Sequence, residues 1–139
     1  MKDTMIKSGS GIIILNDKDE VLLLHRDNIP SIPYPDFWDI PGGQIEENEN
    51  PEQTVRREMN EELGLTDLGE IHFYKSYFNE DNFIDNIFWT RLNVDISKIK
   101  LTEGQAIKYF SINEIRKMKL AFNYHILLSE FFKNVLKYE

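Results

Sequence analysis

Residues 42–65 read GGQIEENENPEQTVRREMNEELGL, and this stretch decides the fold. Its signals predict one helix between residues 50 and 64. Asn50 can cap the helix, Pro51 suits its first position, and Gln53 completes a capping box with Asn50. Gly64 is a natural left-handed terminator. The apolar residues that recur every four positions predict the buried stripe of this helix: Val55, Met59 and Leu63.

The same helix carries three glutamates on one side. At about 100° per residue, Glu58, Glu61 and Glu62 fall within roughly a third of a turn of one another. Glu58 and Glu62 are an i, i+4 pair of like charges, which destabilises an isolated helix. Glu62 also lies next to the buried stripe, so we expect its carboxylate at the edge of the core.

A partly buried anion beside two others is unfavourable unless a cation compensates it. One arginine is expected to satisfy one carboxylate and not three. Mg²⁺ or Mn²⁺, which prefer hard oxygen ligands, would compensate the whole group. The alternative is that an acidic helix face is only a solvated surface, and for Glu61 and Glu62 taken alone that interpretation stays open.

Arg57 is expected on a different face of the helix from the glutamate group. A guanidinium there can hold Glu49 in a bidentate pair and so fix the preceding loop onto the helix. Gly42 and Gly43 permit a tight backbone turn and let carbonyl oxygens approach a metal ion or a phosphate.

The flanking sequence predicts a mixed sheet between helices, an α/β fold. Alternating or apolar runs predict strands at 11–15, 20–25, 68–79, 82–94 and 108–110, with turns at 16–19 and 80–81. A capping box at 111–114 begins a short helix, and residues 123–138 form an amphipathic one. Three prolines within residues 28–36 exclude a helix or central strand there and predict an ordered loop.

Composition narrows the class of protein. The 139 residues suit one domain, and 41% hydrophobic residues can form a core. The chain has no cysteine, which excludes a disulfide scaffold, a thiolate metal site and a cysteine nucleophile. Its apolar runs are far shorter than the roughly 18 residues of a membrane span, and its first residues lack a signal-peptide core, so we expect a cytoplasmic protein without membrane contact.

The net charge of -8 argues against duplex nucleic acid as a partner, because phosphate neutralisation requires a basic face. A small phosphorylated ligand is not excluded. If one binds, something other than net charge must attract it, and a divalent cation is the obvious candidate.

The glycine-glutamate stretch resembles the Nudix box, Gly-x5-Glu-x7-Arg-Glu-U-x-Glu-Glu-x-Gly-U, where U is aliphatic. The box occupies residues 43–65, and every position of the pattern is matched, by Gly43, Glu49, Arg57, Glu58, Met59, Glu61, Glu62, Gly64 and Leu65. The lead-in at 37–43 and the segments at 101–104 and 109–111 are also similar to the family. The resemblance implies a single Nudix domain over residues 1–139, with an α/β/α sandwich and a mixed sheet.

The resemblance also implies roles for individual residues. Glu58 and Glu62 would be the principal ligands of Mg²⁺ or Mn²⁺, with the Gly42 carbonyl as a further ligand. Glu61 would share a second ion or activate water. Glu103 matches the region where many members place another carboxylate, as ligand or base; the alternative is a surface acid. Arg57 and Glu49 would support the catalytic site as its scaffold.

The family hydrolyses a nucleoside diphosphate linked to another group. This small domain is most similar to members that convert a nucleoside triphosphate to a nucleoside monophosphate and pyrophosphate. The substrate would be a small-molecule nucleotide, and a homodimer is left open. Arg26 is a candidate for holding a terminal phosphate, and Tyr34 and Phe37 for stacking a base, with core or connector roles as the alternatives.

Two other functions stay open. Some Nudix-fold domains have lost catalysis and act as nucleotide-binding sensors, although those usually lack glutamates that this box keeps. The substrate could instead be a nucleotide sugar or a dinucleoside polyphosphate. Members that cleave ADP-ribose tend to carry a proline shortly after the box, and here all five prolines lie within it or before it.

Overall fold

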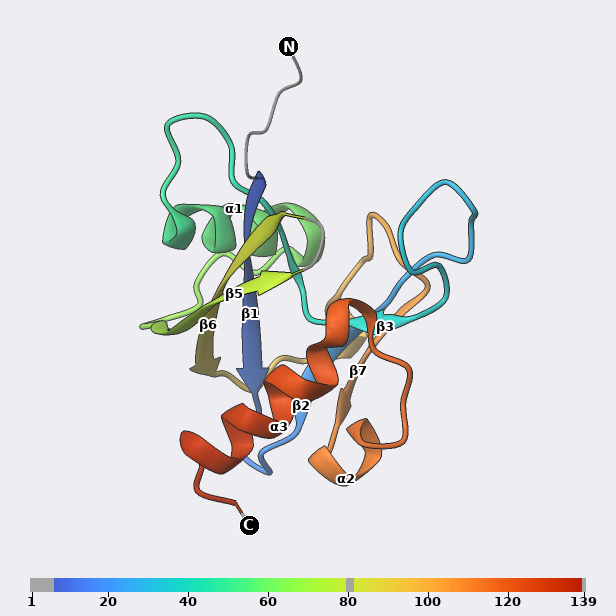
Figure 1. Cartoon of the computed structure of the whole chain (residues 1–139), viewed down its shortest axis with the longest axis vertical. Helices are drawn as coiled ribbons and strands as arrows, with labels where there is room; N and C mark the ends of the chain where they lie inside the picture. Colours follow the sequence, from blue (N-terminus) through green and yellow to red (C-terminus); the bar gives the residue numbers. More distant parts are fainter. Residues whose placement is uncertain (1–6, 80–81, 139) are drawn as a thin grey trace.

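The computed structural model describes residues 7–79 and 82–138, and it forms one seven-stranded mixed sheet (Figure 1). The main strand order is β3-β2-β1-β6-β5, while β4 pairs with β1 and β7 pairs with β2. The strands are β1 (Lys7–Leu15), β2 (Val21–His25), β3 (Trp38–Asp39), β4 (Gly42–Gln44), β5 (His72–Asn79), β6 (Phe83–Arg91) and β7 (Ala106–Phe110). The helices are α1 (Pro51–Leu63), α2 (Ile112–Ile115) and α3 (Tyr124–Asn134), with 3-10 turns η1 (Ile96–Lys98) and η2 (Ala121–Asn123).

β1 is the central strand. It runs parallel to β6 along its whole length, from the pair Lys7 with Phe83 to the pair Leu15 with Arg91. Its other neighbours, β2 and β4, are antiparallel to it. The predicted polar turn between β1 and β2 is held by Asn16, whose side-chain oxygen accepts from two backbone N–H groups of the turn. The mixed sheet expected from the sequence is therefore confirmed.

The two long helices cover opposite faces of the sheet, because successive side chains of β1 point in opposite directions. Ile12 and Ile14 pack with the apolar stripe of α1. Ile13 and Leu15 pack with the apolar face of α3. All four of these β1 side chains are fully buried. The core therefore has two layers, one on each face of the sheet.

The punctuation of α1 agrees with the sequence prediction. Asn50 caps the helix with an extended backbone, and it exchanges reciprocal hydrogen bonds with Gln53. Gly64 ends the helix with a φ of 68°. The capping box between Ser111 and Glu114 at the start of α2 is also present. Local backbone chemistry is thus sufficient to place both helices in the chain.

Several boundaries differ from those expected. β5 begins at His72 and not at residue 68, because Gly69 adopts a left-handed φ of 66° and its N–H bonds the Asp67 side chain, which makes a turn. α3 ends at Asn134, earlier than expected, and Lys137 beyond it has a positive φ. The short strands β3 and β4 were not predicted, and the predicted turn at 80–81 lies outside the described residues.

Across residues 7–79 and 82–138, none of the helices has the length and apolar character needed to cross a bilayer.

The left-handed cap gives a direct test of the fold. Gly64→Ala should lower the free energy of unfolding by about 1 kcal/mol, because an L side chain is disfavoured at positive φ. The space beside Gly64 is open, so no steric clash adds to this cost. Chemical denaturation of this variant and of Asn60→Ala, an exposed position of the same helix, provides the comparison. A loss of stability in Asn60→Ala equal to that in Gly64→Ala would contradict the assignment.

Candidate functional site

Two adjacent glycines in β4 form the centre of the candidate site. A Cβ on Gly43 would overlap the carboxyl group of Glu58, and a Cβ on Gly42 would overlap the carbonyl oxygen of Ser10. The absence of a side chain at Gly43 therefore lets the Glu58 carboxyl of α1 pack directly on the backbone of β4. It also lets β4 lie close against β1, with which it pairs from Gly9 to Gly11.

Glu62 has a buried carboxyl oxygen with no partner. Its Oε2 atom is out of contact with solvent and accepts no hydrogen bond from the described residues. The pKa of Glu62 is raised to about 9, first by burial, then by the hydrogen bond and negative charge of Glu58, and last by the charges of Glu103 and Asp39. The expectation that Glu62 sits at the edge of the core is confirmed. A cation placed here would favour its ionised form.

Arg57 pairs with Glu49 as the sequence predicts. Its Nε atom lies 2.7 Å from Glu49 Oε2, and its Nη2 atom lies 3.0 Å from Glu49 Oε1, a bidentate geometry. Nη2 also donates to the carbonyl of Gln44 at 3.0 Å. The Arg57 and Thr54 hydrogen bonds lower the pKa of Glu49 to about 2. The loop from residue 44 to residue 49 is thereby fixed to α1.

The expectation that one arginine serves one carboxylate is wrong. Arg57 also bonds Glu58 Oε1 at 2.7 Å, lies 3.3 Å from Glu61 Oε2, and lies 3.1 Å from Glu46. The guanidinium has five N–H donors, so it can contact several acceptors at once. Arg57 therefore does not lie on a face separate from the glutamate group.

The fit of this group to a divalent metal can be judged from its donors. No cluster of three or more Asp, Glu or His groups is assembled for a metal within the described ranges. Glu58 and Glu61 instead bond Arg57, so their carboxylates would have to turn. The unpartnered Glu62 oxygen, the adjoining Glu58 carboxyl and the half-buried backbone of Gly42, which lines the cavity described next, are hard oxygen donors that suit Mg²⁺ or Mn²⁺.

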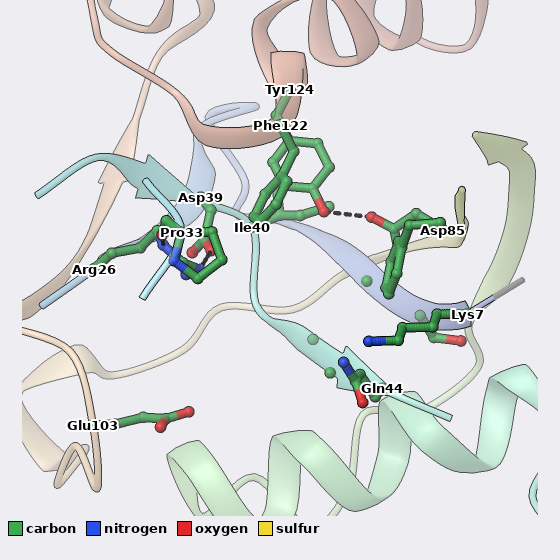
Figure 2. A pocket seen from close by; sticks show the side chains of 15 residues that line it. Lys7, Arg26, Pro33, Asp39, Ile40, Gln44, Asp85, Glu103, Phe122 and Tyr124 are labelled. Carbon is green, nitrogen blue, oxygen red and sulfur yellow. Dashed lines mark hydrogen bonds and ion pairs between the residues drawn. The ribbon is translucent and has the colours of Figure 1, made fainter. Parts of the chain in front are cut away.

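A cavity of about 590 Å³ opens beside the glycines (Figure 2). Residues from several elements line it, among them Ser10 of β1, Arg26 after β2, Asp39 of β3, Gly42 and Gly43 of β4, and Asp85 of β6. Phe122 of η2, Tyr124 at the start of α3 and Glu103 in the loop before β7 also line it. Because Gly43 lines the cavity and its other side packs against the Glu58 carboxyl, the cavity and the glutamate group adjoin.

Two buried aspartates lie in this cavity. Asp39 Oδ2 is 2.7 Å from Arg26 Nη1, while Asp39 Oδ1 has no partner among the described residues. Asp85 accepts a short hydrogen bond from the hydroxyl of Tyr124, which Figure 2 shows pointing at it. Burial raises the pKa of each aspartate to about 6. Burial and the charge of Asp85 raise the pKa of the Tyr124 hydroxyl well above its usual range.

The loop that carries Glu103 is fastened to the proline-rich loop. The N–H of Gly104 donates to Asp27 Oδ2 at 3.2 Å, and Gln105 Nε2 donates to Asp36 Oδ1 at 2.9 Å. The proline-rich segment is ordered, as expected, and it supports the Glu103 side of the cavity.

The three residues predicted to contact substrate lie in different places. Arg26 lines the cavity, but its guanidinium is held by Asp39 and by the carbonyl of Pro33. Tyr34 and Phe37 are in edge contact with each other and are not among the lining residues of this cavity. Tyr34 also contacts Phe122, with 4.8 Å between ring centroids, so it lies behind an aromatic ring that does line the cavity.

The sequence interpretation missed Asp39, Asp85 and the Phe122 region. One signal for Asp85 was present. In residues 83–89 the alternate positions Phe83, Asp85, Ile87 and Trp89 share one face, which places an acid where an apolar residue is expected. For Asp39 the signal was weaker, because a two-residue strand has no periodicity.

Comparison with known proteins supports the resemblance to the Nudix family that the sequence pattern indicated. The NUDIX domain family model matches residues 5–131. An uncharacterised Nudix hydrolase of Listeria innocua is 28% identical over 136 residues, which cover 82% of this chain and 79% of that protein. An 8-oxo-dGTP diphosphatase of Proteus vulgaris is 55% identical over 29 residues, which cover 21% of this chain and only 26% of that relative.

The fold is also that of a solved structure. The MutT protein of Methanosarcina mazei superimposes with a TM-score of 0.77 at 25% identity, covering 96% of this chain and 97% of that one. The match therefore extends beyond the box to the sheet and both flanking helices. The family model spans most of the chain and the structural match spans nearly all of it, and the chain belongs to the NUDIX domain family.

Proposed function

We propose that this protein is a divalent-metal-dependent pyrophosphohydrolase that converts a nucleoside triphosphate and water to a nucleoside monophosphate and pyrophosphate. The observation that carries the proposal is the buried, unpartnered oxygen of Glu62, which lies beside Glu58 where the glutamate group adjoins the cavity. A cationic partner offsets the cost of such an anion, and a polyphosphate chain bound there would need the same cation.

The glutamates divide the work in this proposal. Glu58, Glu62 and the Gly42 carbonyl hold Mg²⁺ or Mn²⁺, and Glu61 shares a second ion or orients water. A bound ion of this kind neutralises a diphosphate and lowers the pKa of coordinated water. Glu103 supplies a further carboxylate from the opposite loop, as ligand or base. Arg57 and Glu49 keep α1 and the preceding loop in register.

The cavity accommodates the nucleoside. Its volume of about 590 Å³ is that of a small-molecule site, and aromatic and polar residues line it together. Arg26 belongs to its wall, while Tyr34 packs against Phe122 and Phe37 packs against Tyr34. The similarity to a relative named 8-oxo-dGTP diphosphatase supports a nucleoside triphosphate, and not a nucleotide sugar, as the substrate of this chain. The proposed activity belongs in the cytoplasm, where such nucleotides occur.

The metal assignment predicts the behaviour of Glu62→Gln. The amide keeps the shape of the side chain but loses a ligating charge, so kcat should fall about 10²-fold, equivalent to about 2.7 kcal/mol in the barrier. Glu52→Gln, at the exposed start of the same helix, serves as the control and should turn over normally. Near-normal turnover of Glu62→Gln would contradict the assignment.

Without bound metal, Glu62→Gln should be more stable than the wild-type protein. A folded-state pKa of about 9 means that wild-type Glu62 ionises more readily unfolded than folded, so its contribution to stability falls as pH rises from the unfolded value towards 9. The glutamine does not ionise. Its melting temperature in EDTA should therefore exceed that of the wild type by more at pH 8 than at pH 5. A large drop at both pH values would indicate a structural role.

The scaffold assignment predicts coupling between Arg57 and Glu49. In a double-mutant cycle of Arg57→Ala and Glu49→Ala, unfolding free energies should show a coupling of about 1 kcal/mol or more. The exposed pair of Arg56 and Glu52 on the same helix is the matched control, and it should couple by only about 0.3–0.5 kcal/mol. Equal coupling in the two cycles would contradict the special role of the Arg57 pair.

The reaction predicts its products. Phosphorus NMR of a nucleoside triphosphate incubated with the protein and Mg²⁺ should show pyrophosphate and nucleoside monophosphate, and EDTA should abolish both. Orthophosphate with nucleoside diphosphate would place the cleavage elsewhere. If no triphosphate is hydrolysed, nucleotide sugars and dinucleoside polyphosphates become the substrates to test, and binding without hydrolysis would indicate a sensor.

A further inference from the structure

Glu103 reaches the cavity without a contact that fixes its side chain. Its carboxylate points away from the loop before β7 and lines the cavity (Figure 2). Within residues 7–79 and 82–138 it forms no hydrogen bond or ion pair, and it is exposed, so packing does not hold it either. The position of this carboxylate therefore depends on the backbone of the loop that carries it.

The backbone directly after Glu103 is held against the end of β2. The N–H of Gly104 donates to Asp27 Oδ2 at 3.2 Å. Gly104 has a φ of 89°, and a Cβ there would approach the carbonyl oxygen of His25 to 3.1 Å. Glu103 and Gly104 share one planar peptide unit, so the Asp27 carboxylate fixes the orientation of that plane. It thereby sets the direction in which the Glu103 side chain leaves the loop.

The side chain of Gln105 fastens the same loop to the segment after β2. Its Nε2 atom donates to the carbonyl oxygen of Arg26 at 2.7 Å and to Asp36 Oδ1 at 2.9 Å. The pKa of Asp36 is lowered, chiefly by this hydrogen bond from Gln105. Arg26 lines the cavity, so one amide group joins the loop of Glu103 to the cavity wall.

These hydrogen bonds lie too close to the surface to decide whether the chain folds. Gln105 is exposed and Asp27 is half-buried, and hydrogen bonds at such positions add little to global stability. Their effect is local, because they restrict the conformations of a loop whose Glu103 side chain has no partner. Their main consequence is therefore the position of the Glu103 carboxylate.

We propose that Asp27 and Gln105 are positioning residues, which hold the Glu103 carboxylate towards the glutamate group of α1. The inference rests on the proposed function in placing a divalent ion at that group, and it adds the reason why the loop is held. Asp27 and Gln105 act only through Glu103. A carboxylate that is ordered before the ion arrives loses less conformational freedom on binding, so the held loop should give the higher affinity.

Calorimetric titration with Mn²⁺ tests the inference without turnover. Glu103→Gln removes the carboxylate charge and should raise the Kd of Mn²⁺ about fivefold or more, the order expected for one charge near a divalent ion. Asp27→Ala and Gln105→Leu each remove one fastening and should raise the Kd about threefold, because the carboxylate must then be ordered on binding. In the Glu103→Gln background neither change should raise the Kd further, because both act through the carboxylate that is missing.

Two further variants exclude general effects. Asp27→Asn keeps a side-chain oxygen that accepts from Gly104 but removes the charge, so its Kd should stay close to that of the wild type. Asn93→Ala is the matched control for Gln105→Leu. The exposed Asn93 side chain also joins two loops, by accepting from the N–H of Asp17 at 3.0 Å, and neither residue lines the cavity. This variant should bind Mn²⁺ as the wild type does.

Amide hydrogen exchange shows whether the loop itself is released. The N–H of Gly104 should exchange about tenfold faster in Asp27→Ala and in Gln105→Leu, whereas the amides of α1 should keep their wild-type rates, because only local opening is promoted. Unchanged exchange at Gly104 in both variants would contradict the hold on the loop.

The outcomes distinguish this inference from the proposed hydrolysis. Unchanged Mn²⁺ affinity in both variants, losses of equal size with and without the Glu103 carboxylate, or no Mn²⁺ binding by the wild type would overturn it, even if triphosphates are hydrolysed. A loss that requires Glu103 and is absent in Asp27→Asn would uphold it even if no triphosphate were hydrolysed. If Asp27→Ala fails to fold, Gln105→Leu at its exposed position still decides the question.

Discussion

The arrangement of the site depends on the contacts of the Arg57 guanidinium. Arg57 lies on α1, yet it bonds Glu49 and the carbonyl of Gln44, both of which precede the helix. It therefore sets the position of the residue 44–49 loop, and with it the end of β4, relative to α1. The same side chain holds Glu58 at 2.7 Å. One cation thus couples the backbone conformation of the loop to the orientation of the Glu58 carboxylate. A shift of the loop should therefore also reorient that carboxylate.

The paired glycines explain why the site forms at this point in the sheet. Gly42 and Gly43 let β4 approach β1 on one side and Glu58 on the other, where any side chain would overlap a neighbour. β4 therefore separates the glutamate group of α1 from the cavity beneath α3 without a wall of side chains between them. A ligand longer than a nucleoside could extend from the aromatic cavity to the glutamates along this strand. The two-layer core keeps the geometry rigid, because the β1 strand beside β4 is buried on both faces.

The sequence predicted the elements governed by local chemistry. The caps at Asn50 and Gly64 and the position of Glu62 at the edge of the core follow from spacing along one helix, and the bidentate pair joins Arg57 of that helix to Glu49 in the loop just before it. The cavity could not be predicted in the same way. Its walls come from strands and loops far apart in the chain, and the pairing of Gly9 with Asp85 is a consequence of the parallel register of β1 and β6. Strand register follows from tertiary packing, and the two-residue strand β3 is too short to show a periodic pattern. The sequence alone therefore does not reveal that Asp39 and Asp85 line the same cavity.

The glutamate group and the cavity differ in how they would interact with a charged ligand. A protein with a net charge of -8, with two buried aspartates in its cavity, offers little long-range attraction to a nucleotide. Arg26 is already engaged by Asp39, so attraction for a phosphate chain would come from Lys7, which also lines the cavity, and from a cation at the glutamate group. The cavity wall itself adds two buried carboxyl groups, those of Asp39 and Asp85. Under the proposed function, affinity for the phosphate chain would therefore depend on a metal ion at the glutamate group, and the shape of the adjoining cavity would determine which nucleoside fits.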